Sequence, residues 1–136
     1  MGNWKLQVED SALADVAEAA AVYRSSGLAE RRPVDDLARF TAMIRGCNLL
    51  VTARLDDRLI GISRSLTDGS YATYLCDLAV DKEFQRQGVG KELIRATQEA
   101  APAAKIVLLS APAAVDYYPH IGFKAHNSAW VLDPLA

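Results

Sequence analysis

The chain is poor in several features that mark whole classes of protein. Its 136 residues include only two cysteines, Cys47 and Cys76, so one disulfide is arithmetically possible but a disulfide framework is not. No His, Cys, Asp and Glu cluster has the spacing of metal ligands, and we expect no metal. No apolar run reaches the ~18 residues of a membrane span, and the N-terminal sequence has no apolar signal core. We therefore expect a cytoplasmic protein with no membrane partner.

An excess of positive charge is also missing. Lys and Arg number 15 against 17 Asp and Glu, which gives a formal net charge of -2. A general nucleic-acid binder gains affinity by neutralising phosphates with such an excess, so we expect no nucleic-acid partner. What is present is an ordinary globular mix, 51% hydrophobic and 24% charged, without repeats. The length suits one domain, which we expect to span residues 1–136.

The hydrophobic pattern predicts an α+β fold. Helix-spaced and strand-spaced segments follow one another in an order that gives antiparallel hairpins first, then a strand–loop–helix–strand unit. We therefore expect a mixed, mostly antiparallel central sheet with one parallel strand pair, flanked by about four helices. The expected elements are a short strand at 6–9, helices at 11–26 and 33–46, strands at 49–55, 58–66 and 71–80, a helix at 89–100, a strand at 105–109, a short helix at 113–118, and closing strands near 124–125 and 129–132.

The loop after the long strand carries the features of a phosphate site. Gly88 and Gly90 allow the backbone to approach a ligand closely and to take positive φ. The free N–H groups at the start of the following helix, together with the helix dipole, favour an anion. Arg86 and Lys91 add positive charge beside them. The segment therefore predicts phosphate binding.

Two common nucleotide-binding loops do not fit this segment. The ATP and GTP loop needs a glycine where the chain has Gln85, and Ser or Thr where it has Glu92, so a nucleotide hydrolase is disfavoured. The dinucleotide loop fails because Leu93 stands at its third glycine. The remaining pattern, Gln85-x-x-Gly88-x-Gly90, resembles the pyrophosphate loop of the GNAT N-acetyltransferase superfamily.

A second stretch strengthens that resemblance. Ala114-x-x-Tyr117-Tyr118-x-x-x-Gly122-Phe123 is similar to the closing motif of the superfamily, and it lies in the expected order after the loop. The resemblance covers most of the chain and implies a GNAT-like fold and an acyltransferase that uses acetyl-CoA as cosubstrate.

Two residues depart from the family pattern. Ala111 stands where members often have an Asn that contacts the pantetheine arm, so that contact is missing here. Pro119 follows Tyr118 directly, and proline disfavours helical geometry in the residue before it, which affects how the tyrosine is aimed.

The resemblance also implies where the cosubstrate lies. The strands at 71–80 and 105–109 would diverge, and the pantetheine arm would fill the gap like an extra strand. Backbone groups of Leu78 and Val80 would bond the arm, and the Leu78 N–H would polarise the thioester carbonyl, a type of interaction that commonly lowers a barrier by ~2.7–4 kcal/mol. The implied cofactor-binding residues are Leu78, Ala79, Val80, Gln85, Arg86, Gln87, Gly88, Val89, Gly90, Lys91 and Tyr118.

Tyr118 matches the family tyrosine that protonates the leaving thiolate. A phenol has a pKa of ~10 and a thiol one of ~8.5, so the tyrosine still holds a proton at neutral pH. We assign packing to Tyr117 and chemistry to Tyr118.

The general base stays open between two residues of the long strand. Strand alternation predicts that Tyr74, Cys76, Leu78 and Val80 share the face of the cofactor gap, and that Thr73, Leu75 and Asp77 share the other. Tyr74 would then lie nearer the substrate, whereas Asp77 is a carboxylate in an apolar strand, where burial can raise its pKa. Either residue can act through a chain of waters, or Asp77 can anchor a loop.

The acceptor is expected to be the primary amine of a small molecule. In the family, the first two helices and the last hairpin choose the acceptor, and here they carry Arg24, Arg31 and Arg32, which can pair with a carboxylate or phosphate. Tyr74 and Cys76 complete the candidate substrate residues. Two alternatives remain: a non-catalytic acyl-CoA-binding regulatory module, and acetylation of a protein or peptide amine. Trp4, Trp130 and the last hairpin are candidates for a homodimer edge.

Overall fold

A five-stranded sheet forms the centre of the protein. The computed structural model describes residues 2–136, and its strands follow the order β1 (Lys5–Glu9), β2 (Leu49–Leu55), β3 (Arg58–Thr67), β4 (Ala72–Val80) and β5 (Lys105–Val107). Neighbouring strands are antiparallel except β4 and β5, which are parallel. The predicted α+β class with a mixed, mostly antiparallel sheet is therefore confirmed.

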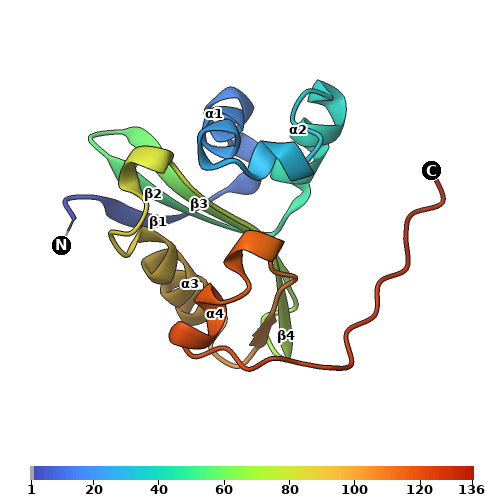
Figure 1. Ribbon diagram of the computed structural model, residues 1–136. Helices are drawn as coiled ribbons and strands as arrows, with labels where there is room; N and C mark the ends of the chain where they lie inside the picture. The colour runs from blue at the N-terminus through green and yellow to red at the C-terminus, as the bar shows by residue number, and fades with distance from the viewer. Residues whose placement is uncertain (1) are drawn as a thin grey trace.

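Helices cover both faces of the sheet (Figure 1). On one face α1 (Val16–Ser26) and α2 (Leu37–Gly46) bury Tyr23, Phe40 and Ile44 against the strands. On the other face lie α3 (Val89–Ala100), which packs on β1 to β4, and the short α4 (Tyr117–His120). The two faces thus have separate hydrophobic cores. Short 3-10 turns connect these elements: η1 (Ser11–Leu13), η2 (Leu28–Arg31), η3 (Lys82–Phe84) and η4 (Pro112–Ala114).

The starts of the helices differ in a way that matters for the site. The side chain of Asp15 accepts a hydrogen bond from the Glu18 N–H at the start of α1, and Asp36 accepts one from Arg39 at the start of α2, both at 3.1 Å. Such caps satisfy N–H groups that have no partner inside the helix. By contrast, α3 starts after Gly88 without a side-chain cap. Its first N–H groups are therefore available to a ligand.

The β2–β3 hairpin forms as the sequence predicts. Asp56 and Asp57 both adopt positive φ, 48° and 70°, the backbone that a tight two-residue turn requires. The bounds of both strands agree with the expected ones to within one residue.

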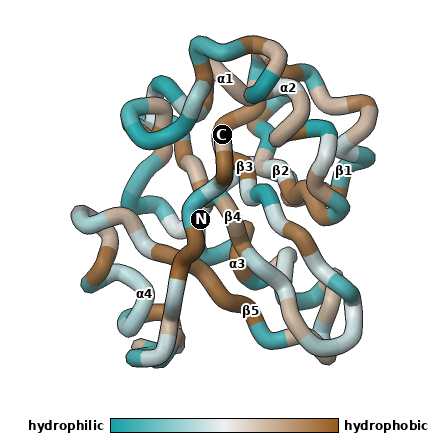
Figure 2. Tube along the Cα trace, turned by 90° about the vertical axis from the view of Figure 1, so that its right-hand side faces the viewer, coloured by the Kyte–Doolittle hydropathy of each residue, from teal (hydrophilic) through white to brown (hydrophobic). Residues whose placement is uncertain are grey.

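The parallel pair β4–β5 diverges, as expected. Hydrogen-bonded pairing covers only three residues of each strand, from Ala72 opposite Lys105 to Tyr74 opposite Val107. Beyond that point β4 continues to Val80, whereas β5 has ended, at Val107 rather than the expected Leu109. Hydrophobic residues run along both strands near this point (Figure 2). The two strands therefore part beyond Tyr74 and Val107, which leaves a gap between their backbones.

A bulge in β4 overturns the expected alternation of its side chains. Asp77 lies opposite Arg64 and Leu75 opposite Ser65, so Cys76 is an extra residue with no partner in β3. Because β3 alternates without interruption, the bulge puts Leu75 on the same side of the sheet as Leu78. Tyr74 moves to the side of Asp77, away from Leu78 and Val80. The predicted shared face of Tyr74, Cys76, Leu78 and Val80 is therefore wrong.

The predicted closing strands are absent from the described residues. The segment 124–136 holds no strand and runs away from the body of the protein (Figure 1). An alternating pattern indicates that a segment can be extended, but a strand also needs an edge to pair with. Here Trp130 is 92% exposed and Leu132 97% exposed.

Three further observations concern residues 2–136. None of the helices there has the length and apolar character of a membrane span. No group of three or more His, Cys, Asp or Glu side chains in this part of the chain is arranged to hold a metal ion. Cys47 and Cys76 are both free thiols.

Candidate active site

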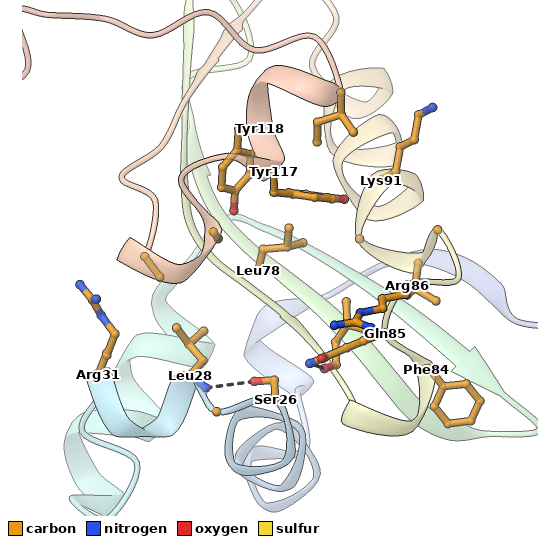
Figure 3. Close-up of a pocket in the computed structure, with 18 of the residues that line it drawn as sticks. Ser26, Leu28, Arg31, Leu78, Phe84, Gln85, Arg86, Lys91, Tyr117 and Tyr118 are labelled. Carbon is orange, nitrogen blue, oxygen red and sulfur yellow. Dashed lines mark hydrogen bonds between the residues drawn. The ribbon is translucent and has the colours of Figure 1, made fainter.

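A cavity of about 960 Å³ opens where β4 and β5 diverge. Its walls come from four parts of the chain: the end of α1 with η2, the side of β4 that carries Leu78 and Val80, the loop that leads into α3, and the η4–α4 region. Figure 3 shows these side chains around the space. The lining residues are Ser26, Gly27, Leu28, Glu30, Arg31, Leu78, Val80, Phe84, Gln85, Arg86, Gly88, Val89, Gly90, Lys91, Ala111, Pro112, Ala114, Tyr117, Tyr118 and Ile121.

The backbone of β4 turns polar groups toward this cavity. The Asp81 N–H donates to the Ile60 carbonyl of β3 at 2.8 Å. The N–H and C=O groups of successive residues point to opposite edges of a strand. Those of Leu78 and Val80 therefore point away from β3, toward the gap. The Gln85 side chain donates to the Val80 carbonyl from that side at 2.9 Å. The Leu78 N–H is therefore placed where a carbonyl in the gap can accept it.

The loop before α3 makes a cradle for an anion. Arg86 and Gly88 both adopt positive φ, 65° and 94°, which turns successive N–H groups to one side. These N–H groups lie at the uncapped start of α3, where the helix dipole favours negative charge. The Arg86 and Lys91 side chains flank the cradle on one side of the cavity (Figure 3). Phosphate oxygens fit this chemistry.

Most of the predicted cofactor residues meet here. Of the eleven, nine line the cavity and two do not. Ala79 is 1% exposed and belongs to the core beneath α1 and α2, because it points to the opposite side from its neighbours. The Gln87 side chain instead donates to the Glu83 carbonyl at 3.2 Å, within the loop.

The two tyrosines of α4 face different parts of the cavity. Their rings meet edge to face, with centroids 5.2 Å apart, and Phe123 supports Tyr118 from behind at 5.4 Å. The Tyr118 hydroxyl points toward Leu78, whereas that of Tyr117 points toward α3 (Figure 3). Burial raises the pKa of both phenols, and the neighbouring Tyr117 raises that of Tyr118 further. Tyr118 therefore keeps its proton at neutral pH.

The residues that depart from the family pattern leave this geometry intact. Pro119 is the third residue of α4, in the first turn of the helix, where its missing N–H removes no bond within the helix. Tyr118 is accordingly helical despite the proline that follows it. Ala111 lines the cavity with a methyl group where an amide would have reached further in.

Asp77 does not face the cavity as a free carboxylate. Its side chain is fully buried and accepts hydrogen bonds from Arg32 Nε at 2.5 Å, Arg64 Nε at 2.6 Å and the Tyr23 hydroxyl at 2.6 Å. Burial by itself raises the pKa of Asp77, but the Arg64 charge and these hydrogen bonds outweigh it and hold the pKa below its usual range. The expectation of a raised pKa for Asp77 is therefore wrong, although burial acts in the expected direction.

A side cavity of about 90 Å³ adjoins the main one. Some of the remaining candidate residues line it, and others line neither cavity. Arg31, Arg32, Cys76 and Asp77 line it, together with Leu78 and Tyr118. Tyr74 lines neither cavity, because the bulge at Cys76 turned it away. Arg24 also lies outside both.

Some residues that line the main cavity were not predicted from the sequence. Glu30 and Ser26 line the main cavity, and Tyr117, expected only to pack, lines it too. No local pattern marks Glu30, because it reaches the site only through the packing of η2 against α1.

Comparisons with known proteins show the family and the fold of the chain. A family model described as an acetyltransferase (GNAT) domain matches residues 18–133. Among curated proteins, the chain is similar to the chloroplastic GCN5-related N-acetyltransferase 2 of Arabidopsis thaliana. The two are 33% identical over 73 residues, which is 52% of this chain and 28% of the relative. The chain thus spans less than a third of that relative's length.

Solved structures show the same fold. A GNAT-family acetyltransferase of Streptococcus pneumoniae superposes with a TM-score of 0.74 at 17% identity, covering 96% of this chain and 99% of the other. An aminoglycoside acetyltransferase from an uncultured soil metagenomic sample has a TM-score of 0.71 at 20% identity, covering 98% and 96%. At these identities the likeness concerns the fold.

Proposed function

The chain belongs to the GNAT acetyltransferase family, and from this we propose that it transfers an acetyl group from acetyl-CoA to the primary amine of a small molecule. The observation that carries the proposal is the single cavity that joins the uncapped start of α3, the free backbone of Leu78 and the hydroxyl of Tyr118. A diphosphate fits the start of α3, and a thioester carbonyl fits the Leu78 N–H. A leaving thiolate fits beside the Tyr118 hydroxyl.

The transfer proceeds by direct attack. The neutral amine nitrogen attacks the thioester carbonyl carbon, a C–N bond forms, and the carbonyl oxygen gains negative charge in a tetrahedral intermediate. The Leu78 N–H donates to that oxygen as the charge develops, which lowers the barrier. The C–S bond then breaks, and the thiolate takes a proton from the Tyr118 hydroxyl. The amine nitrogen gives up one proton to a base as the C–N bond forms, and a proton returns through solvent to the Tyr118 phenolate, so the reaction balances and the protein is restored.

We assign the role of proton acceptor to Glu30. Asp77 was one candidate, but its carboxylate is occupied by two guanidinium groups and a phenol, so it is a positioning residue that ties α1, β3 and the residue after η2 to β4. Tyr74, the other candidate, lines neither cavity. Glu30 is the carboxylate that lines the main cavity, and it can take the proton directly or through water.

Two measurements test this function. Acetyl-CoA, but not Mg-ATP, should raise the melting temperature of the protein, since the loop lacks the features of an ATP site. A panel of amines should then release free thiol from acetyl-CoA. Binding without thiol release for any small amine, amino acid or peptide would instead favour a regulatory acyl-CoA-binding module, and release only with peptides would favour a protein acetyltransferase.

We also propose a homodimer as the state in solution. The tail carries Trp130, Val131, Leu132 and Leu135 in exposed positions, and β5 is a short strand at the edge of the sheet. Pairing with a second copy would cover both features.

A further inference from the structure

The three arginines expected to recognise the acceptor differ in their ion-pair and hydrogen-bond partners. Arg24 pairs with Asp35 at 3.1 Å on the open surface. Arg32 donates Nε to Asp77, Nη1 to the Arg31 carbonyl at 2.8 Å and Nη2 to the Cys76 carbonyl at 3.2 Å, so each of its nitrogens has a partner. Within residues 2–136, the Arg31 guanidinium makes no ion pair or hydrogen bond. Arg31 is therefore the arginine that a ligand can engage.

Arg31 also has the right position for a second ligand. It lines both the main and the side cavity. Figure 3 places it on the side away from Gln85, Arg86 and Lys91, with Leu78 and Tyr118 between the two ends. The diphosphate end and the Arg31 end thus lie on either side of the groups that carry out the transfer. A molecule that reaches Leu78 from the Arg31 end meets the thioester from the side opposite the diphosphate.

Charge at the Arg31 end favours an anion. The buried Asp77 carboxylate is already matched by two guanidinium groups, those of Arg32 and Arg64. Counted with Arg31 and with Glu30, the carboxylate that lines the main cavity beside it, this end carries three guanidinium groups and two carboxylates and keeps a surplus of positive charge. A second ammonium group on the acceptor would be repelled there, whereas a carboxylate would be attracted.

The rest of the side cavity is apolar. Leucine and alanine side chains make up most of the lining besides the charged groups: Leu28, Leu75, Leu78, Leu108, Leu109, Ala111 and Ala114. Such a surface favours an aliphatic group, and the volume of about 90 Å³ restricts it to a compact one.

We propose that the acceptor is a small amine that also carries a carboxylate and an aliphatic body, as in an aliphatic α-amino acid, and that Arg31 selects it. The planar guanidinium donates two parallel hydrogen bonds to the carboxylate, which orients the amine toward the thioester. The proposal rests on the acetyl transfer proposed above and names the substrate class of that site.

The test compares acceptors that differ in one group. Thiol release from acetyl-CoA is measured with L-leucine, L-leucinamide, 3-methylbutylamine, phosphoethanolamine and spermidine. For the wild-type protein we expect kcat/KM to be highest for leucine. In Arg31→Ala the advantage of leucine over leucinamide should fall about 10- to 100-fold, mainly through KM. Because both proteins meet the same acceptors, differences in amine ionisation cancel in this ratio.

Two further variants and a binding measurement complete the design. Arg31→Lys keeps the positive charge but not the two parallel donors of the guanidinium, so it should show part of the preference for leucine over leucinamide. Arg24→Ala removes an ion pair on the open surface and should show the full wild-type preference. Calorimetry should show leucine binding to the CoA-loaded wild-type protein but not to Arg31→Ala.

The outcomes separate this proposal from the proposed function. Equal or better turnover of 3-methylbutylamine or spermidine, or an unchanged leucine preference in Arg31→Ala, overturns it. A preference for phosphoethanolamine would mean that the site selects a phosphate and not a carboxylate, which also overturns the proposal. Acetyl-CoA binding with no turnover of leucine also overturns it and leaves cosubstrate binding standing. If acetyl-CoA does not bind at all, the proposed function itself has failed.

Discussion

The hydroxyl oxygen of Tyr117 lies over Gly90, 3.2 Å from the position that a Cβ atom would take on that glycine. Leu78 and Val80 close in on the same point at 3.7 and 3.8 Å. Gly90 is the second residue of α3, so its bare backbone keeps open the place where the aromatic wall of α4 meets the start of the helix.

Gly90→Ala should therefore weaken cosubstrate binding without harming the fold. Alanine favours a helix over glycine by about 1 kcal/mol, so the melting temperature should hold or rise slightly. The added methyl group crowds the anion cradle, and the Kd for CoA should rise about tenfold, measured by calorimetry. In the Tyr117→Phe background the contact with the hydroxyl disappears. Normal affinity in that double variant would mean that tyrosine displacement, not crowding of the ligand, is the cause.

Tyr118→Phe should separate chemistry from binding. The variant keeps the ring packing against Tyr117 and Phe123 but has no proton to give to the thiolate, so kcat should fall about 100-fold. The Kd for CoA should stay nearly the same. Tyr71→Phe, at an exposed tyrosine outside the cavity, is the matched control. A kcat close to wild type in Tyr118→Phe would remove the tyrosine from the mechanism.

Much of the site could be predicted because its signals are local. Gly88 and Gly90 lie within a few residues of the charges that flank them, and two adjacent aspartates suffice to specify the hairpin turn. The divergence of β4 and β5 was expected from the resemblance to the family, and its pairing pattern bears this out.

The parts that could not be predicted depend on contacts between distant segments. Strand alternation assigns faces correctly only while the register holds, and nothing in the residues around Cys76 marks the bulge that shifts it. Asp77 looks like a base in an apolar strand until Arg32 and Arg64, 45 and 13 residues away, are placed on it. Glu30 enters the cavity for the same reason, through the packing of η2.

The tail offers a test of assembly. If its exposed apolar residues pair with a second copy, light scattering coupled to size exclusion should show a dimer, since a stable interface needs roughly 1,000 Å² of buried surface. Trp130→Asp should convert it to a monomer. Leu13→Asp, at another exposed apolar residue (81% exposed), should leave the dimer unchanged. A monomeric wild-type protein at micromolar concentration would rule out this assembly.

Glu30→Gln should lose activity in a pH-dependent way. At neutral pH most of an aliphatic amine with a pKa of ~10 is protonated, so the reaction depends on a proton acceptor, and kcat/KM should fall about 100-fold. Toward pH 10 the free amine dominates, and the variant should approach the wild type. Glu83→Gln is the control, because that carboxylate lies on η3 outside the cavity. An equal loss at every pH would indicate that Glu30 only shapes the site.

Asp77→Asn should destabilise the protein at neutral pH and less so in acid. Because the folded-state pKa of Asp77 lies below its unfolded value, its charge contributes stability that is present above about pH 4 and is lost as the pH falls through the folded pKa. Removing one partner of a buried ion pair costs about 3–5 kcal/mol, so chemical denaturation at pH 7 should show a loss of that order.

The size of that loss should shrink as the pH falls below about 4 and approach zero once the pH has fallen through the folded-state pKa, where the wild-type carboxylate is also neutral and resembles the amide. Denaturation curves are measured from pH 7 down to the lowest pH at which both proteins fold. Asp35→Asn is the matched control, because that carboxylate pairs with Arg24 on the open surface and should contribute nothing measurable at either pH. A deficit in Asp77→Asn that stays constant across this range would mean that the side chain acts through its shape and hydrogen bonds. The ion pairs with Arg32, which follows η2, and with Arg64 of β3 would then not be what fastens these segments to β4 beside the cavity.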